Sequence, residues 1–366
     1  MKRRQFLAAA AGASALAMPA PALATGQRIL KMVTAWPKDT PGPGAAAGRL
    51  AKRISAMTDG ELTVKVFAAG EMVPALESFD AVSGGVADLY HGAEHYWPGK
   101  SRAFDFFAAV PFGLTAGEMN AWIHHGGGQG LWDELAADYN IKPFMAGNTG
   151  ARMGGWFNRE INNVEDFKGL KIHMPGLGGE ALARLGAEPA TPPTTGGIAG
   201  GIAGALRSGA LDAAVGSGPW IDLAQGLHEA AKHYYYPGFH EPGRVMSSGV
   251  NLNVWNSLDD AQQQIVAAAM SAETLVTTAE FDARNASALE TLRTVHGVSL
   301  RKFHGPILQA IGEAAGRVVA EAAAEDAFSK KVFESFLGFR KKAMAWSKYA
   351  DQAFLDARLL PFTYGE

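Results

Sequence analysis

The sequence contains no cysteine among its 366 residues. This absence excludes disulfide bonds, thiolate metal sites and anchoring through a lipidated N-terminal cysteine. Several catalytic motifs are missing as well. The chain has no HExxH zinc motif, no P-loop lysine, no GxGxxG fingerprint after a strand and no GxSxG nucleophile elbow. We therefore predict that the protein is not an enzyme.

The sequence also lacks a strong excess of either charge. It has 33 Lys and Arg against 36 Asp and Glu, a net charge of −3. Without Lys2, Arg3 and Arg4, 30 basic residues face 36 acidic ones, and the charge is −6. A mildly acidic protein has no general attraction to nucleic acid or to anionic lipid. No apolar run is long and uninterrupted enough for a membrane helix.

The N-terminus has the pattern of an export signal. Arg3 and Arg4 precede Phe6 and an alanine-rich apolar run over residues 7–20, which is too short to span a bilayer. Ala22-Leu23-Ala24 is a small-x-small cleavage site. We predict a twin-arginine export signal over residues 1–24 and a periplasmic protein, not lipid-anchored, that begins near Thr25. The alternative is a chance basic start to a cytosolic chain.

Hydrophobic periodicity predicts strands that alternate with helices in two series. This alternation favours an α/β fold with largely parallel pairing. The first series has strands at 29–36, 62–66 and 87–90 and helices at 45–57 and 76–82. The second starts near Phe144, with strands at 156–157, 170–174 and 211–215, a turn at 164–169 and helices at 179–185 and 205–208.

The last third of the chain is predicted to be helical. Asp259 is a suitable N-cap for a helix that runs through Glu280 to about Thr294. A further helical block covers 306–357. It carries a largely aromatic stripe of Phe328, Val332, Phe333, Phe336 and Phe339. This stripe packs either on its own lobe or in a seam with a second subunit.

Two glycine-rich segments invite a ligand-binding interpretation. Adjacent His124 and His125 point in different directions on a helix, so the following Gly126–Gly128 is better explained as a helix end. The segment from Thr195 to Gly201 could cradle an anion with backbone N–H groups. It has no nearby lysine, which favours a flexible connection.

Several motifs resemble the DctP-type periplasmic solute receptors of TRAP transporters. The resemblance runs over essentially all of residues 29–366, and it is closest to the branch that binds 2-oxo or 2-hydroxy monocarboxylates such as pyruvate and lactate. The motifs are Tyr96–Lys100, Ala109–Gly113, Gly147–Gly150, Met153–Phe157, Pro175–Glu180, Ser208–Ala214 and Tyr235–Gly243.

The resemblance implies a two-lobed α/β binding protein with a hinge, a long lobe-spanning helix and a C-terminal helical segment. Lobe 1 would cover residues 25–150, with part of 250–300 returning to it. Lobe 2 would cover 151–250, and the lobe-crossing and C-terminal helices 251–366. Such a receptor traps a small organic anion between its lobes and passes it to the permease subunits. Members of this branch often form homodimers through C-terminal helices.

The chain departs from that branch where the family holds its ligand. The branch binds the carboxylate with an arginine at the position of His173. It binds a sodium or calcium ion with a glutamine at the position of Arg152 and a Glu-Trp pair at the positions of Val215 and Gly216. Trp97, in the Tyr96–Lys100 motif, is the remaining candidate for the ligand site.

These substitutions remove the oxygen ligands that a hard cation needs. Arg152 could supply the positive charge instead, and His173 a hydrogen-bond donor. Gly216 in place of tryptophan should leave room for a bulkier solute. We therefore hypothesise a receptor with no metal or other cofactor, in which Arg152 binds an organic anion. The alternatives are a receptor for an uncharged or bulkier solute, and a sensor-type or degenerate receptor without transport.

Overall fold

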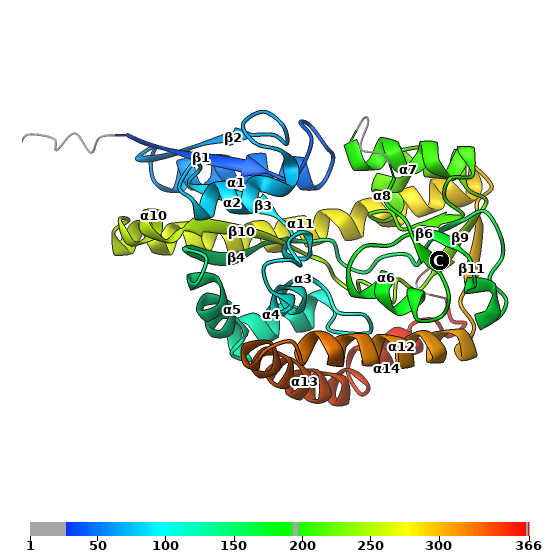
Figure 1. The fold of residues 1–366 in the computed structure, drawn as a ribbon. Helices are drawn as coiled ribbons and strands as arrows, with labels where there is room; N and C mark the ends of the chain where they lie inside the picture. Colours follow the sequence, from blue (N-terminus) through cyan, green and yellow to red (C-terminus); the bar gives the residue numbers. More distant parts are fainter. Residues whose placement is uncertain (1–26, 193–196, 364, 366) are drawn as a thin grey trace, which may run out of the picture.

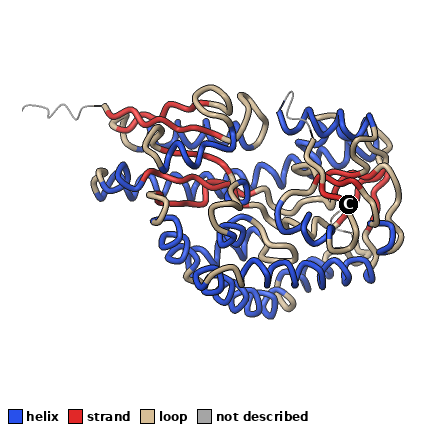
Figure 2. The backbone as a smooth tube through the Cα atoms, in the orientation of Figure 1, coloured by secondary structure: helices blue, strands red, loops and turns tan. Residues whose placement is uncertain are grey.

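The computed structural model describes residues 27–192, 197–363 and 365, so the predicted export signal lies outside the described residues. Two mixed sheets form the centres of two lobes, and long helices connect the lobes (Figure 1). The strands gather in two separate groups (Figure 2). The predicted two-lobed α/β architecture is confirmed.

The sheet of the first lobe has the order β2-β1-β3-β10-β4. β1 pairs in parallel with β2 and β3, whereas β10 is antiparallel to β3 and β4. Parallel pairing therefore holds for only part of this sheet, because β10 returns from the other lobe in the opposite direction. The strands are β1 Arg28–Thr34, β2 Leu62–Phe67, β3 Leu89–Gly92, β4 Ile141–Asn148 and β10 Val245–Asn251.

Short helices cover this sheet. A capping box of Thr115 and Glu118 starts α4, which ends at Gly126. Gly127 follows in the left-handed conformation, with φ 85°, which glycine adopts without strain. The predicted helix end after His125 is thus confirmed. The elements are α1 Pro43–Met57, η1 Ala75–Glu77, α2 Ser78–Ser83, η2 Glu94–Tyr96, η3 Arg102–Phe104, α3 Asp105–Ala108, α4 Ala116–His125 and α5 Gly128–Ala137.

The sheet of the second lobe has the order β11-β9-β5-β8-β6-β7. β5 is antiparallel to β8 and β9, and the other pairs are parallel. The edge strand β11 lies in the interval between the predicted helices 259–294 and 306–357, where the sequence predicts no strand. The elements are β5 Gly155–Phe157, η4 Val164–Phe167, β6 Lys171–His173, α6 Gly176–Ala183, β7 Glu188–Pro189, α7 Gly197–Ser208, β8 Ala213–Ala214, α8 Pro219–Ala224, α9 Leu227–Ala230, β9 His233–Tyr236 and β11 Ser299–Lys302.

The glycine-rich segment differs from its prediction. Thr195 and Gly196 lie outside the described residues, but the chain from Gly197 onward is helix α7 rather than a flexible connection. Ile202 and Leu206 are buried in the second lobe. This apolar face outweighs the low helix propensity of the glycines, because tertiary packing provides most of the stability of a helix.

Among the described residues, four segments cross between the lobes. The chain crosses from β4 to β5, returns from β9 to β10, and crosses again in α11 Asp260–Thr294, which follows α10 Leu252–Asn256. Asp259 caps α11 through a hydrogen bond from the Gln262 N–H, as predicted. α12 Gly305–Ala323 is the fourth crossing, because Ile307 packs in the second lobe and Val318 in the first.

The chain ends in α13 Ala327–Ser347 and α14 Asp351–Ala357. Val332 and Phe336 are buried in the first lobe, and the Phe336 ring meets Trp122 edge-on at 5.3 Å between centroids. Packing of the aromatic stripe on its own lobe is confirmed. None of the helices in the described ranges combines the length and apolar character needed to span a bilayer.

Candidate functional site

Two of the interlobe crossings lie side by side and hold the main chain of Arg152. The N–H of Thr149 donates to the Arg244 carbonyl at 3.0 Å, and the N–H of Gly238 donates to the Arg152 carbonyl at 3.0 Å. A Cβ on Gly238 would lie 2.4 Å from the Arg152 carbonyl oxygen, so only glycine permits this approach. Arg152 is thereby fixed between the lobes.

Three buried charged side chains come together at this point. The Arg152 guanidinium forms an ion pair with the Glu241 carboxylate, and Arg244 Nε lies 3.9 Å from the same carboxylate. Side-chain exposure is 3% for Arg152 and 8% each for Glu241 and Arg244. Two guanidiniums therefore lie near one carboxylate, and only Arg152 is in close contact with it, in an environment where charges interact strongly.

Burial and the neighbouring Arg244 charge lower the pKa of Arg152, whereas Asp222 opposes that shift. The shift brings the pKa of Arg152 to about 9, so Arg152 remains a cation at neutral pH.

Two buried histidines lie in the field of these arginines. Burial, followed by Arg244 and Arg152, holds the pKa of His95 well below its usual value. The pKa of His240 is also held well below its usual value, first by burial and then by Arg152, Arg244 and His95. Both rings are therefore neutral at pH 7. Within the described residues, none of their four ring nitrogens has a hydrogen-bond partner.

The wall of the site in the second lobe is built around Asp222 on α8. Its carboxylate accepts from Trp156 Nε1 at 2.9 Å and from the Tyr234 hydroxyl at 2.7 Å. It also accepts from the N–H groups of Ser217 and Gly218 at 2.7 and 3.2 Å. These four donors satisfy the carboxylate, so Asp222 organises this wall.

The structure brings some of the predicted site residues together and separates others. Arg152 is at the centre of the charged cluster. Gly216 lies against Asp222, and a Cβ there would be 2.0 Å from Oδ1. The space beside Gly216 is thus filled by Asp222 and does not open room for a bulkier solute. Val215 packs in the core of the second lobe.

The other two candidates have local partners. His173 Nδ1 lies 3.1 Å from the Ala190 carbonyl, and burial lowers the pKa of the ring. Trp97 donates its indole N–H to the Leu76 carbonyl at 2.7 Å and packs in the core of the first lobe. Its neighbour Tyr96 contacts the cluster, because its ring lies 4.5 Å from the His95 ring between centroids.

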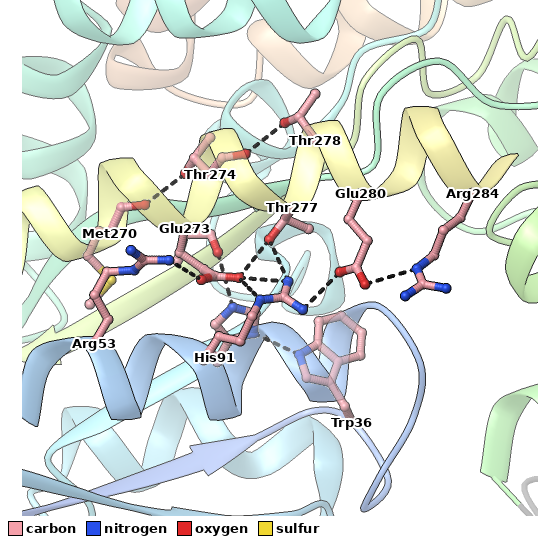
Figure 3. Close-up of polar contacts among 12 residues, drawn as sticks. Trp36, Arg53, His91, Met270, Glu273, Thr274, Thr277, Thr278, Glu280 and Arg284 are labelled. Atoms are coloured by element: carbon pink, nitrogen blue, oxygen red, sulfur yellow. Dashed lines mark hydrogen bonds and ion pairs between the residues drawn. The ribbon is translucent and has the colours of Figure 1, made fainter. Parts of the chain in front are cut away.

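An ion-pair network fastens α11 to the first lobe behind the site (Figure 3). The fully buried Glu273 carboxylate pairs with Arg49 at 2.8 Å and Arg53 at 3.5 Å. Below it, Trp36 Nε1 donates to His91 Nδ1 at 2.8 Å (Figure 3). The Trp36 ring then meets Tyr96 edge-on at 5.9 Å. The Glu273 ion pairs therefore anchor α11 to α1 of the first lobe.

Sequence reasoning missed most residues of the cluster, namely His95, Asp222, His240, Glu241 and Arg244. Three of them are nearly consecutive in His240-Glu241-Pro242-Gly243-Arg244. In the sequence, the signal for these site residues is a pair of opposite charges, one on each side of a Pro-Gly dipeptide. Their link to Arg152 is a tertiary contact that spacing does not reveal.

Comparisons with known proteins agree with this architecture. Residues 32–326 match the family described as bacterial extracellular solute-binding protein, family 7, or DctP. The chain is 40% identical over 324 residues to the monocarboxylate 2-oxoacid-binding periplasmic protein all3028 of Nostoc sp., with 88% of this chain and 87% of the relative covered.

Two solved structures show the same fold. A TRAP periplasmic solute-binding protein from Colwellia psychrerythraea, with bound calcium and pyruvate, is 35% identical with a TM-score of 0.86, covering 91% of this chain and all of that one (100%). A TRAP transporter solute-binding protein from Bordetella bronchiseptica is 33% identical with a TM-score of 0.85, covering 91% and 97%. It is a mixed-occupancy dimer with calcium and picolinate in one site. The chain therefore belongs to the DctP family of bacterial extracellular solute-binding proteins.

Proposed function

We propose that this protein captures one small organic acid of the 2-oxo or 2-hydroxy type between its lobes and delivers it to the membrane subunits of a TRAP transporter. The observation that carries the proposal is the buried pair of guanidiniums, Arg152 and Arg244, between the two lobes. A buried carboxylate needs a cation and hydrogen-bond donors, and this cluster offers both. The 2-oxoacid-binding relative supports the same class of solute.

Closure of the lobes explains how binding becomes capture. His95 follows β3 in the first lobe, whereas Asp222 belongs to the second and Arg152 to a crossing. A solute that contacts all three regions stabilises the closed form relative to the open form. The function is binding and transfer, which agrees with a family of receptors rather than enzymes.

We further propose that this receptor works without the metal found in its relatives. Within the described ranges, no three His, Asp or Glu side chains are grouped around one metal position. A cation beside Glu241 would also meet the guanidiniums of Arg152 and Arg244. Because like charges repel at these distances, the residues present do not fit a sodium or calcium ion.

The charge-binding proposal is tested by calorimetry of the purified protein with pyruvate, longer 2-oxo acids and uncharged analogues. We expect carboxylates to bind and uncharged analogues to fail. Arg152→Gln should weaken carboxylate binding by roughly 30-fold to several thousand-fold, the equivalent of about 2–5 kcal/mol for a truncated buried charge pair. Unchanged affinity in Arg152→Gln would contradict the role of this charge.

The metal proposal has its own test. Affinity for pyruvate should be the same after EDTA treatment and after addition of calcium. Loss of binding in EDTA, restored by calcium, would overturn it.

One observation supports a second candidate function. Glu241 already pairs with Arg152, so the cluster is partly neutralised without a solute. A receptor for an uncharged solute would use the neutral histidines as its hydrogen-bonding groups. Tight binding of an uncharged analogue such as an amide or an ester, with no binding of the acid, favours this candidate.

The remaining proposals concern export and assembly. Paired arginines at the N-terminus support export by the twin-arginine pathway, and the crossings support lobe boundaries near residues 150 and 250. The exposed apolar residues of the C-terminal helices support a homodimer, and they include Leu337, Met344, Trp346, Tyr349, Phe354 and Leu355. Light scattering should give twice the chain mass, and Trp346→Glu with Phe354→Glu should give a monomer.

A further inference from the structure

Arg152 and Arg244 are both buried, but their partners differ. Arg152 forms the ion pair with Glu241, whereas Arg244 Nε is 3.9 Å from that carboxylate, beyond hydrogen-bonding distance. Among the described residues, this Nε has no hydrogen-bond partner. Arg244 is thus a buried cation whose fork is not matched by a carboxylate of the described chain.

The backbone of Arg244 is held firmly. Its N–H donates to the Thr149 hydroxyl at 3.3 Å, and its carbonyl accepts from the Thr149 N–H at 3.0 Å. These bonds join the two crossings at the base of the side chain. The backbone of Arg244 is therefore fixed, and the burial of its side chain limits the positions of the guanidinium, which lowers the entropy cost of binding.

The two histidines complete the set of groups without partners. His95 comes from the first lobe, and His240 comes from the second crossing, four residues before Arg244. A neutral imidazole has one N–H donor and one acceptor nitrogen. Buried polar groups are nearly always hydrogen-bonded, so the two N–H groups, which have no partner among the described residues, are available to an acceptor on a polar solute.

We propose that Arg244 contacts the carboxylate of the solute directly, and that His95 and His240 hydrogen-bond the oxygen on its second carbon. Glu241 holds Arg152 beside them and keeps the cluster at one net positive charge. The Asp222 carboxylate is already satisfied by four donors of its own lobe, so the single positive charge compensates one solute carboxylate and leaves a second one uncompensated. This assignment rests on the proposed function and names the residues that determine its specificity.

The test compares pyruvate with propionate, which has the same chain length and carboxylate but no oxygen on its second carbon. In calorimetry, Arg244→Gln should weaken both ligands at least 30-fold, and Arg244→Lys should recover part of the loss. His95→Leu and His240→Leu should weaken pyruvate at least tenfold and change propionate less than threefold. Arg301→Gln, which removes an exposed arginine paired with Glu160, is the control and should bind like wild type.

The outcomes separate this assignment from the proposed function. If wild-type protein binds no 2-oxo acid, the proposed function fails. If wild type binds pyruvate and Arg244→Gln binds it equally well, only the role of Arg244 is overturned. Equal losses for pyruvate and propionate in both histidine variants would overturn the role of the histidines. If Arg244→Gln does not fold, the histidine variants still decide how the solute oxygen is recognised. Arg244→Lys then tests whether carboxylate binding needs the planar guanidinium or only a positive charge.

Discussion

Replacing Glu241 with glutamine should destabilise the empty protein and strengthen anion binding. The substitution keeps the shape of the side chain but removes the carboxylate that pairs with Arg152. Leaving a buried charge without its partner costs about 3–5 kcal/mol. Arg152 is 3% exposed, so water provides little compensation. We expect a loss near the lower end, about 3 kcal/mol, because the amide oxygen still accepts a hydrogen bond.

A solute carboxylate should restore much of this loss. It brings a negative charge to the same two guanidiniums, so Glu241→Gln should bind pyruvate more tightly than wild type does. At a ligand concentration 100 times the Kd, binding adds about 2.7 kcal/mol of stability. The difference in stability between wild type and variant should therefore be smaller in excess pyruvate than without it.

Urea unfolding followed by tryptophan fluorescence measures both quantities, with and without pyruvate, at low salt. Glu165→Gln is the control, because Glu165 pairs with Lys168 on the surface at 71% exposure and should change little. If Glu241→Gln is as stable as wild type without ligand, the inference that Glu241 and Arg152 form a stabilising buried ion pair is refuted. Weaker pyruvate binding by that variant would refute the idea that Glu241 and the solute compete for the same cations.

Three further substitutions test the framework of the site. Gly216→Ala should cost about 1–3 kcal/mol from overpacking against Asp222, whereas Gly204→Ala, in open space on α7, should be neutral or stabilising. Phe336→Ala should cost about 3–5 kcal/mol, because this buried ring joins α13 to the first lobe. Burial lowers the pKa of His91 to about 4, so the unfolded chain binds a proton first as pH falls below about 6.5. Between about pH 6.5 and pH 4, the free energy of unfolding of wild type should fall by about 3 kcal/mol more than that of His91→Gln. Parallel pH profiles of unfolding free energy for the two proteins would contradict this.

Local patterns account for much of the fold. The N-cap of α11, the end of α4 at Gly126 and the alternation in β2 depend on neighbouring residues, and the sequence predicts all three. Two-residue strands such as β8 and the added edge strand β11 depend on partners far along the chain. The sequence therefore indicates the elements more reliably than their pairing.

For the site, too, the sequence indicates single residues more reliably than their long-range contacts. A cation at position 152 is evident from the sequence, but its carboxylate partner is 89 residues away and becomes adjacent only through the crossings. The candidates His173 and Trp97 come from the family pattern. Both side chains make hydrogen bonds to main-chain carbonyls of their own lobes. Tertiary geometry decides which residues of a motif face the solute.

The contact between Gly216 and Asp222 has a consequence for how this receptor could have arisen. With the Asp222 carboxylate in its present place, any side chain at position 216 collides with it, and without Asp222 the Trp156 and Tyr234 donors lose their acceptor. Neither position can change alone without damage. Among homologues, a glycine at 216 should therefore occur together with an aspartate at 222, and the two should be gained or lost as a pair.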